Sequence, residues 1–200
     1  MVTTPIAMSQ SELQARASRL RLVISDVDGV LTDGGVYYSS QGEEMKRFSV
    51  RDGMGVERLR IDGVDTALLT RESSAIVSKR ALKLQVRLVY QGVGDKGAFL
   101  TKILDDAGVQ LDQVGYIGDD TNDAAIMQAI ASAGLVAAPS DARPEIRALA
   151  HHRSAAPGGC GAFRDFAEWL LDLRAAARVP RATNGHRDLN DTARPPMNDD

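Results

Sequence analysis

Residues 22–33 read Leu22-Val23-Ile24-Ser25-Asp26-Val27-Asp28-Gly29-Val30-Leu31-Thr32-Asp33, and this stretch decides the fold. It begins as a brief apolar run rich in β-branched residues, which is typical of a strand buried in a parallel sheet. Acidic residues and Gly29 then end the run. Alternate residues of an extended chain share a face, and a loop that opens here can curl Asp28 back over Asp26. We therefore expect two carboxylates to face one ligand at the end of a buried strand.

The rest of the chain alternates between short apolar runs and helical stretches. Further strands are predicted over 64–69, 86–90, 114–117 and 135–138. Helices are predicted over 53–61, 74–84, 95–107, 121–132 and 161–177. This alternation predicts an α/β fold, a Rossmann-like parallel sheet with helices on both faces. In such sheets, ligands bind outside the carboxyl ends of the strands.

One segment interrupts the alternation. Residues 35–38 and 45–50 flank a polar turn at 39–43, which predicts an inserted β-hairpin. The hairpin carries Tyr37, Tyr38 and Phe48, and no separate cap domain is predicted that would cover them. Exposed aromatic side chains of this kind favour self-association.

Three parts of the chain differ in composition. Residues 1–19 are expected to form an N-terminal segment with a short helix, because Ser9 and Glu12 have capping-box spacing. Residues 20–177 are expected to form a single domain. Residues 178–200 contain three prolines and few apolar residues, which predicts a flexible tail.

Composition excludes several classes of partner. The 24 Lys and Arg residues against 27 Asp and Glu give a net charge of −3, and no basic block indicates nucleic acid or an anionic membrane surface. No segment is apolar for long enough to span a bilayer. The only cysteine, Cys160, can form no intrachain disulfide. A cytoplasmic location is therefore expected.

A second acidic cluster, Gly118-Asp119-Asp120-Thr121-Asn122-Asp123, follows the strand predicted at 114–117. Together with the first pair it brings five carboxylates to one sheet edge, where they would repel each other. Mg²⁺ is the ion expected to relieve this repulsion. We assign Asp119 to the metal and leave Asp120 and Asp123 divided between supporting the metal ligands and capping the next helix.

Thr70 ends the second predicted strand, and Lys96 opens a predicted helix. Alone, each has an ordinary interpretation as a solvated surface residue. At the same edge as the acids, however, a hydroxyl and an ammonium group supply what a phosphoryl group needs.

These segments, in this order and at strand ends, resemble the four signature motifs of the haloacid dehalogenase superfamily. Within it, residues 33–38, 48–53, 90–92 and 158–164 are similar to the 3-deoxy-D-manno-octulosonate 8-phosphate phosphatases. The resemblance implies a phosphoric monoester hydrolase in which Asp26 attacks phosphorus and Asp28 is the general acid and base. It also implies that Mg²⁺ is held by Asp26, Asp119 and the backbone carbonyl of Asp28, and that Thr70 and Lys96 hold the phosphoryl oxygens. Arg51 is a weaker candidate for substrate contact.

The resemblance further implies a homotetramer in which a neighbouring subunit completes the active site. The substrate would be a phosphorylated 3-deoxy-2-keto sugar acid, with 3-deoxy-D-manno-octulosonate 8-phosphate, a lipopolysaccharide precursor, as the leading choice. Three residues depart from the octulosonate pattern, namely Arg71, Glu72 and Cys160. Glu72 in particular resembles relatives that act on nine-carbon acids such as 2-keto-3-deoxynononate or N-acetylneuraminate 9-phosphate.

Two rival functions stay open on the sequence alone. A non-catalytic oligomerisation module of the cytidylyltransferase-associated type would have no need for a complete set of repelling acids. A phosphomutase or phosphotransferase ranks last, because no predicted cap would exclude water.

Overall fold

The computed structural model describes residues 8–179, so the tail predicted beyond residue 179 lies outside the described part. Its main sheet is parallel throughout, with strand order β5-β4-β1-β6-β7-β8. The strands are β1 (Leu22–Ser25), β4 (Asp65–Leu69), β5 (Leu88–Tyr90), β6 (Val114–Ile117), β7 (Leu135–Ala138) and β8 (His152–Arg153). The predicted α/β fold is confirmed. Strand β8 was not predicted, because a pair of residues is too short to show a hydrophobic pattern.

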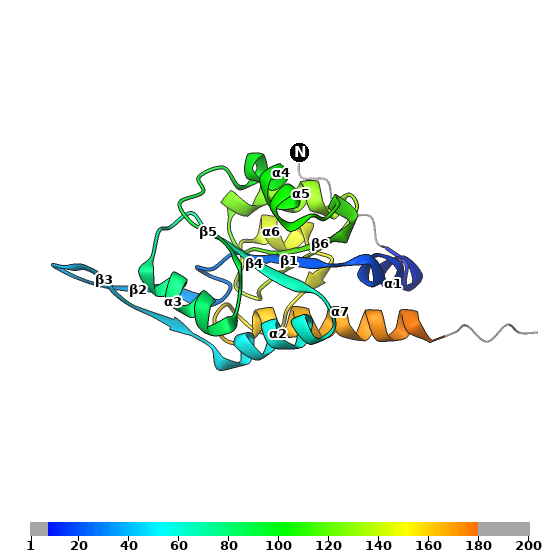
Figure 1. Cartoon of the computed structure of the whole chain (residues 1–200), viewed down its shortest axis with the longest axis horizontal. Helices are drawn as coiled ribbons and strands as arrows, with labels where there is room; N and C mark the ends of the chain where they lie inside the picture. The colour runs from blue at the N-terminus through cyan, green and yellow to red at the C-terminus, as the bar shows by residue number, and fades with distance from the viewer. Residues whose placement is uncertain (1–7, 180–200) are drawn as a thin grey trace, which may run out of the picture.

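Helices cover both faces of this sheet, as Figure 1 shows. One face packs against α1 (Gln10–Arg19), α2 (Val50–Ile61), α3 (Ala75–Leu84) and α7 (Ala162–Arg178). The other packs against α4 (Lys96–Ala107), α5 (Ala124–Ala131) and α6 (Pro144–Leu149). Short 3₁₀ turns, η1 (Leu111–Gln113) and η2 (Thr121–Asp123), precede β6 and α5. Within the described range, no helix is both long enough and apolar enough to cross a membrane.

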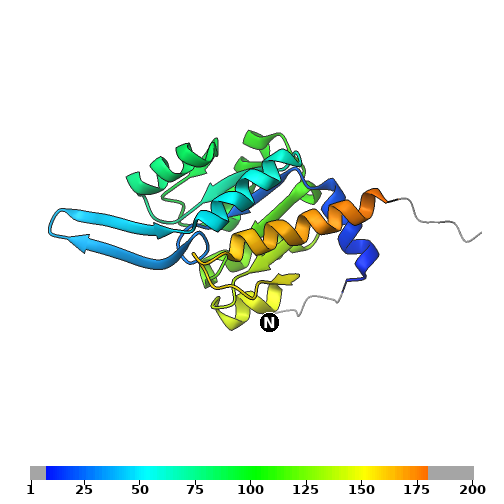
Figure 2. The same cartoon turned by 90° about the horizontal axis from the view of Figure 1, so that it is seen from below.

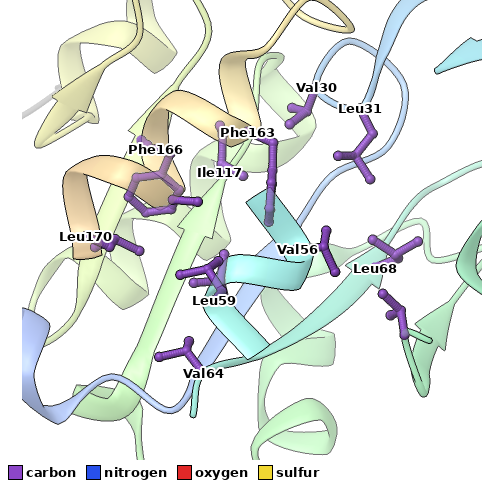
Figure 3. Packing of buried hydrophobic residues seen from close by; sticks show 14 of the residues in the cluster. Val30, Leu31, Val56, Leu59, Val64, Leu68, Ile117, Phe163, Phe166 and Leu170 are labelled. Carbon is purple, nitrogen blue, oxygen red and sulfur yellow. The ribbon is translucent and has the colours of Figure 1, made fainter. Parts of the chain in front are cut away.

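The core forms because successive residues of each strand point to opposite faces. Val23 joins the cluster on the α2 and α7 side, whereas Ile24 joins the cluster on the α4 and α5 side. In Figure 3, Phe163 and Phe166 of α7 lie among the aliphatic side chains of α2 and the sheet. Both phenylalanines are fully buried, so α7 is anchored against the sheet by its apolar stripe.

The predicted hairpin is formed by β2 (Thr32–Ser39) and β3 (Gly42–Phe48), and it projects from the body of the protein in Figure 2. Tyr37 is 61% exposed and Tyr38 is 69% exposed. Phe48 differs from this expectation: it packs against the core beneath the hairpin, and the Arg80 guanidinium lies 5.5 Å from its ring centroid. The hairpin therefore exposes its tyrosines but not its phenylalanine.

The order of the strands locates the candidate site. The chain starts in the middle of the sheet with β1, adds β4 and β5 on one side, and then returns to add β6, β7 and β8 on the other. The carboxyl end of β1 is thus the point where the connections diverge, and such a point leaves a crevice for ligand. Asp26, Thr70 and Asp119 all follow strand ends around this point.

Candidate active site

The loop after β1 turns sharply, and Gly29 makes the turn possible. Its φ of +92° lies in the left-handed region, which side chains rarely adopt. A Cβ atom at this position would lie 2.1 Å from Oδ2 of Asp119, so any side chain here would collide with that carboxylate. The close approach brings the loop that carries Asp26 and Asp28 directly against the acidic segment after β6.

Lys96 is the buried cation of the site. Its ammonium nitrogen lies 2.8 Å from Oδ2 of Asp26 and 2.6 Å from Oδ1 of Asp123, and its side chain has no exposed surface. Burial on its own lowers the pKa of Lys96, but the two carboxylates outweigh burial and raise it. Lys96 therefore stays charged and offsets part of the acidic charge.

Asp123 organises the segment after β6. Its carboxylate accepts hydrogen bonds from Lys96, from the hydroxyl of Tyr116, and from the backbone N–H groups of Asp119 and Asp120. Asp120 is exposed and caps η2, with Oδ1 accepting from the N–H of Thr121 at 2.6 Å. Both residues therefore take part in capping the turn, and Asp123 in addition contacts Lys96.

Burial changes the proton affinity of the two inner acids. It raises the pKa of Asp26 to about 7, with repulsion from Asp123 adding to the shift and Lys96 opposing it. It raises the pKa of Asp119 to about 8, with repulsion from Asp26 and Asp123 adding to the shift. One buried lysine is thus too little positive charge for this cluster, and a further cation would favour the ionised carboxylates.

The acids fit a magnesium ion. Carboxylate oxygens of Asp26, Asp119 and Asp123 lie within 4.8 Å of one another. The Asp123 oxygens are already engaged by four donors, whereas the buried Oδ1 of Asp119 accepts no hydrogen bond from the described residues. Hard oxygen donors in a partly open site suit Mg²⁺, and the unpartnered oxygen of Asp119 is available as a metal ligand. The magnesium predicted from the sequence is consistent with this arrangement.

A pocket of about 290 Å³ opens in front of these acids. It is lined by Asp26, Asp28, Thr70, Arg71, Glu72, Asp119, Asp120, Thr121 and Asn122. The lining includes neither Lys96, which lies behind Asp26, nor Arg51, whose exposed side chain is on the first turn of α2. The assignment of Lys96 to the phosphoryl oxygens and of Arg51 to substrate stays a prediction.

Thr70 and Glu72 occupy the rim on the β4 side. Thr70 is buried, and its Oγ1 accepts from the backbone N–H of Glu72 at 3.2 Å. The following helix, α3, is capped by Ser74, whose hydroxyl accepts from the N–H of Val77. Glu72 therefore has no capping role, and it is an exposed residue of the pocket lining.

Lys46 of β3 was missed by the sequence analysis. Its side chain is 1% exposed, and Nζ lies 2.5 Å from Oδ1 of Asp28. The neighbouring residues of β3, Met45 and Arg47, are exposed on the opposite face of the hairpin. The alternation of side chains along a strand was the available signal, but it does not say which face of the hairpin turns toward the site.

The glycine-rich segment after β8 closes against the β1 loop. A Cβ at Gly158 would lie 2.0 Å from the carbonyl oxygen of Gly29, so only glycine fits this contact. Cys160 is exposed, and its Sγ lies 3.8 Å from both terminal nitrogens of Arg47, which also pairs with Asp33. The cysteine therefore sits outside the pocket lining, beside the base of the hairpin.

Comparison with known proteins agrees with this geometry, although no protein-family profile matches the chain. The 3-deoxy-D-manno-octulosonate 8-phosphate phosphatase of Yersinia pestis is 40% identical over 156 residues, covering 78% of this chain and 82% of that protein. The enzyme of the same name from Haemophilus influenzae is 34% identical, covering 84% of this chain and 91% of that protein.

Solved structures give the same result. The 3-deoxy-D-manno-octulosonate 8-phosphate phosphatase of Moraxella catarrhalis, in complex with magnesium, phosphate and KDO, superposes with a TM-score of 0.76. It is 33% identical and covers 84% of this chain and 95% of that chain. A Legionella pneumophila structure assigned to the HAD superfamily is 34% identical, with a TM-score of 0.76 and coverage of 84% and 90%. The chain therefore belongs to the family of 3-deoxy-D-manno-octulosonate 8-phosphate phosphatases within the haloacid dehalogenase superfamily.

Proposed function

We propose that the protein hydrolyses the phosphomonoester of 3-deoxy-D-manno-octulosonate 8-phosphate with Mg²⁺ as cofactor. The observation that carries this proposal is the juxtaposition of the Asp26 and Asp28 carboxylates in one pocket with an unpartnered oxygen of Asp119. Relatives named for this reaction share 34–40% of their aligned residues with the chain and match most of its length. They support both the reaction and the substrate.

The chemistry follows from the two acids that line the pocket. A carboxylate oxygen of Asp26 attacks phosphorus, the bond between phosphorus and the sugar oxygen breaks, and Asp28 gives its proton to the departing oxygen. Asp28 then takes a proton from the water that attacks the aspartyl phosphate, which releases inorganic phosphate and restores both carboxyl groups. Thr70 also lines the pocket, which supports the proposal that its hydroxyl donates a hydrogen bond to a phosphoryl oxygen.

The metal would be held by the carboxylates of Asp26 and Asp119 and by the backbone carbonyl of Asp28. When bound, it supplies positive charge that offsets the charge of the phosphoryl group and favours ionised carboxylates. Lys96 holds Asp26 from behind, and Asp123 holds Lys96, so these two residues orient the attacking carboxylate. Arg51 is outside the pocket lining and stays a weaker candidate for substrate contact.

A nine-carbon sugar acid 9-phosphate is the second candidate substrate. The observation that favours it is that Glu72 belongs to the pocket lining, because a carboxylate there can accept hydrogen bonds from hydroxyl groups and would repel a substrate carboxylate. The pocket is the same in either case, so the two candidates differ in substrate and share one mechanism.

We also propose that the protein is a cytoplasmic homotetramer in which a neighbouring subunit completes the site. The exposed tyrosines of the projecting hairpin support self-association. The open pocket also supports it, since among the described residues no second domain covers the carboxylates. The lone cysteine is compatible with a reducing compartment.

The function is tested by release of inorganic phosphate from 3-deoxy-D-manno-octulosonate 8-phosphate and from 2-keto-3-deoxynononate 9-phosphate, each with excess Mg²⁺ or excess chelator. We expect turnover that depends on Mg²⁺, with a higher kcat/KM for the eight-carbon substrate. A higher kcat/KM for the nine-carbon substrate would move the assignment to the second candidate. Equal rates with and without chelator would contradict the role of the metal.

A further inference from the structure

The hairpin reaches into the active site through one buried side chain. Lys46 of β3 has its ammonium nitrogen 2.5 Å from Oδ1 of Asp28 and 3.8 Å from Oε1 of Glu43. Glu43 in turn accepts a hydrogen bond from the hydroxyl of Ser74, the residue that caps α3, at 3.0 Å. The network therefore joins the β1 loop, the hairpin and the start of α3.

The two oxygens of Asp28 have different surroundings. Oδ1 is held by Lys46 and by the Thr32 hydroxyl, which donates to it at 3.4 Å. Oδ2 is buried and accepts no hydrogen bond from any residue that the structure describes. Asp28 also lines the pocket. The contacts on Oδ1 thus fix the rotation of the carboxyl group and leave Oδ2 without a hydrogen-bond partner among the described residues.

We propose that Lys46 is the positioning residue for Asp28, fixing the orientation of its carboxyl group so that the proton can reach the leaving group. The inference rests on the proposed phosphatase reaction and adds a role for the hairpin within a single subunit. Lys46 itself does not line the pocket, so it acts through Asp28. A general acid that can rotate away from the departing oxygen loses much of its effect, because proton transfer needs hydrogen-bond distance.

The leaving group separates this role from a merely structural one. Departure of a sugar alkoxide requires a proton from Asp28, whereas p-nitrophenolate is a weak base that departs without one. For both substrates, kcat/KM reports the steps up to aspartyl phosphate formation and release of the leaving group. A defect in positioning the acid therefore lowers kcat/KM for the sugar acid phosphate selectively, whereas general damage to the site lowers both values.

The experiment compares wild type, Lys46→Met and the control Lys79→Met with 3-deoxy-D-manno-octulosonate 8-phosphate and p-nitrophenyl phosphate. Lys79 is an exposed lysine on α3, away from the pocket lining. We expect Lys46→Met to lower kcat/KM for the sugar acid phosphate by about tenfold to a hundredfold and for p-nitrophenyl phosphate by less than about threefold. The control should match wild type. Equal losses on both substrates, or no loss on either, would overturn the proposal.

Additional variants keep the test decisive. In an Asp28→Asn background, Lys46→Met should cause no further loss on the sugar acid phosphate, because the group it positions is gone; a further loss of the same size as in wild type contradicts the proposal. If Lys46→Met does not fold, Lys46→Leu, which also lacks both the charge and the hydrogen-bond donor, should show the same selective loss. If wild type hydrolyses p-nitrophenyl phosphate but neither sugar acid phosphate, the proposed substrate fails, and Lys46 is tested on any alkyl phosphate that wild type accepts.

Discussion

The ammonium nitrogen of Lys96 lies 2.8 Å from Oδ2 of Asp26, in a contact that is closed to solvent. The same nitrogen contacts Asp123, so the lysine joins Asp26, the proposed nucleophile, to the segment after β6. Because Asp26, Lys96 and Asp123 come from three different strand–helix units, the orientation of the Asp26 carboxylate depends on how the two halves of the sheet pack.

Replacing Lys96 by Met should both destabilise and inactivate the protein. The change leaves Asp26 and Asp123 buried without their cation, and breaking a buried ion pair costs about 3–5 kcal/mol. Urea unfolding with chelator present measures the free energy, and phosphate release measures the activity. Lys102→Met on the same helix removes an exposed pair with Asp106 and should change stability by less than about 1 kcal/mol. Similar losses of stability and activity in the two variants would show that the buried contact contributes no more than the exposed pair does.

The sequence was sufficient to predict the strand-end acids because their positions follow from the strands themselves. Asp26 directly follows β1, and Asp119 follows β6 after one glycine. Both strands have unambiguous apolar runs, and parallel strands align their carboxyl ends. The central place of Asp123 could not be predicted, since its partners Lys96 and Tyr116 lie on two other elements.

Lys46 was beyond prediction for a different reason. The hairpin pairing has register shifts between Thr32 and Val36 and again between Tyr37 and Tyr38. The second shift leaves one extra residue in β3 between the hairpin turn and Lys46, so counting residues from the turn does not show which face Lys46 occupies. The prediction that Tyr37 is exposed was correct. The prediction that Phe48 is exposed was wrong, because Phe48 lies at the base of the hairpin and packs against the core, which the sequence pattern does not show.

Asp26→Asn should abolish turnover and leave the protein folded. An amide is not a nucleophile toward phosphorus, and removing a carboxylate whose pKa is raised by burial relieves repulsion with Asp123. Phosphate release should fall by at least about a thousandfold, with the thermal melting curve in chelator unchanged or shifted upward. Asp65→Asn, at the amino end of β4 and away from the strand ends that carry the site, is the matched control and should keep its activity. More than a few per cent of wild-type activity in Asp26→Asn would rule out covalent catalysis by this residue.

The stabilisation given by Mg²⁺ should increase with pH. Burial raises the pKa of Asp26 to about 7 and of Asp119 to about 8, above the ordinary value of 3.8, so without metal the folded state holds more protons than the unfolded state between these values. These acids therefore make the metal-free protein less stable as pH rises from about 4 to about 8. Mg²⁺ needs the ionised carboxylates, and its binding opposes this loss.

The measurement is the melting temperature in excess Mg²⁺ minus that in chelator, taken at about pH 5.5 and about pH 8. Taking the difference cancels groups remote from the metal, such as His151, whose pKa burial lowers to about 4. The Mg²⁺-dependent increase should be larger at the higher pH by a few degrees, and it should disappear in Asp119→Asn. An increase that is equal at both pH values would contradict the raised pKa values of Asp26 and Asp119.

The projecting hairpin should mediate assembly. Light scattering is expected to show about four chains per particle for wild type, consistent with closed symmetry. Tyr38→Glu places a charge on a side chain that is 69% exposed, and should shift the particle toward smaller species. Ile61→Glu, at the far end of α2 and 75% exposed, is a comparable change outside the hairpin and should leave the mass unchanged. A monomeric wild type at micromolar concentration would remove the neighbouring subunit from the proposed site.

Glu72→Arg should shift substrate preference toward the eight-carbon acid. Glu72 and Thr70 both line the pocket, and because Ser74 caps α3, a change at residue 72 leaves the helix cap intact. Arginine at this position replaces repulsion of a substrate carboxylate with attraction, which is worth about 1–3 kcal/mol, or roughly tenfold to a hundredfold in the ratio of the two kcat/KM values. Glu57→Arg makes the same charge change on the exposed side of α2 and controls for the altered net charge. If both variants leave the ratio at its wild-type value, Glu72 does not contact the substrate, and the nine-carbon candidate loses the observation that favours it.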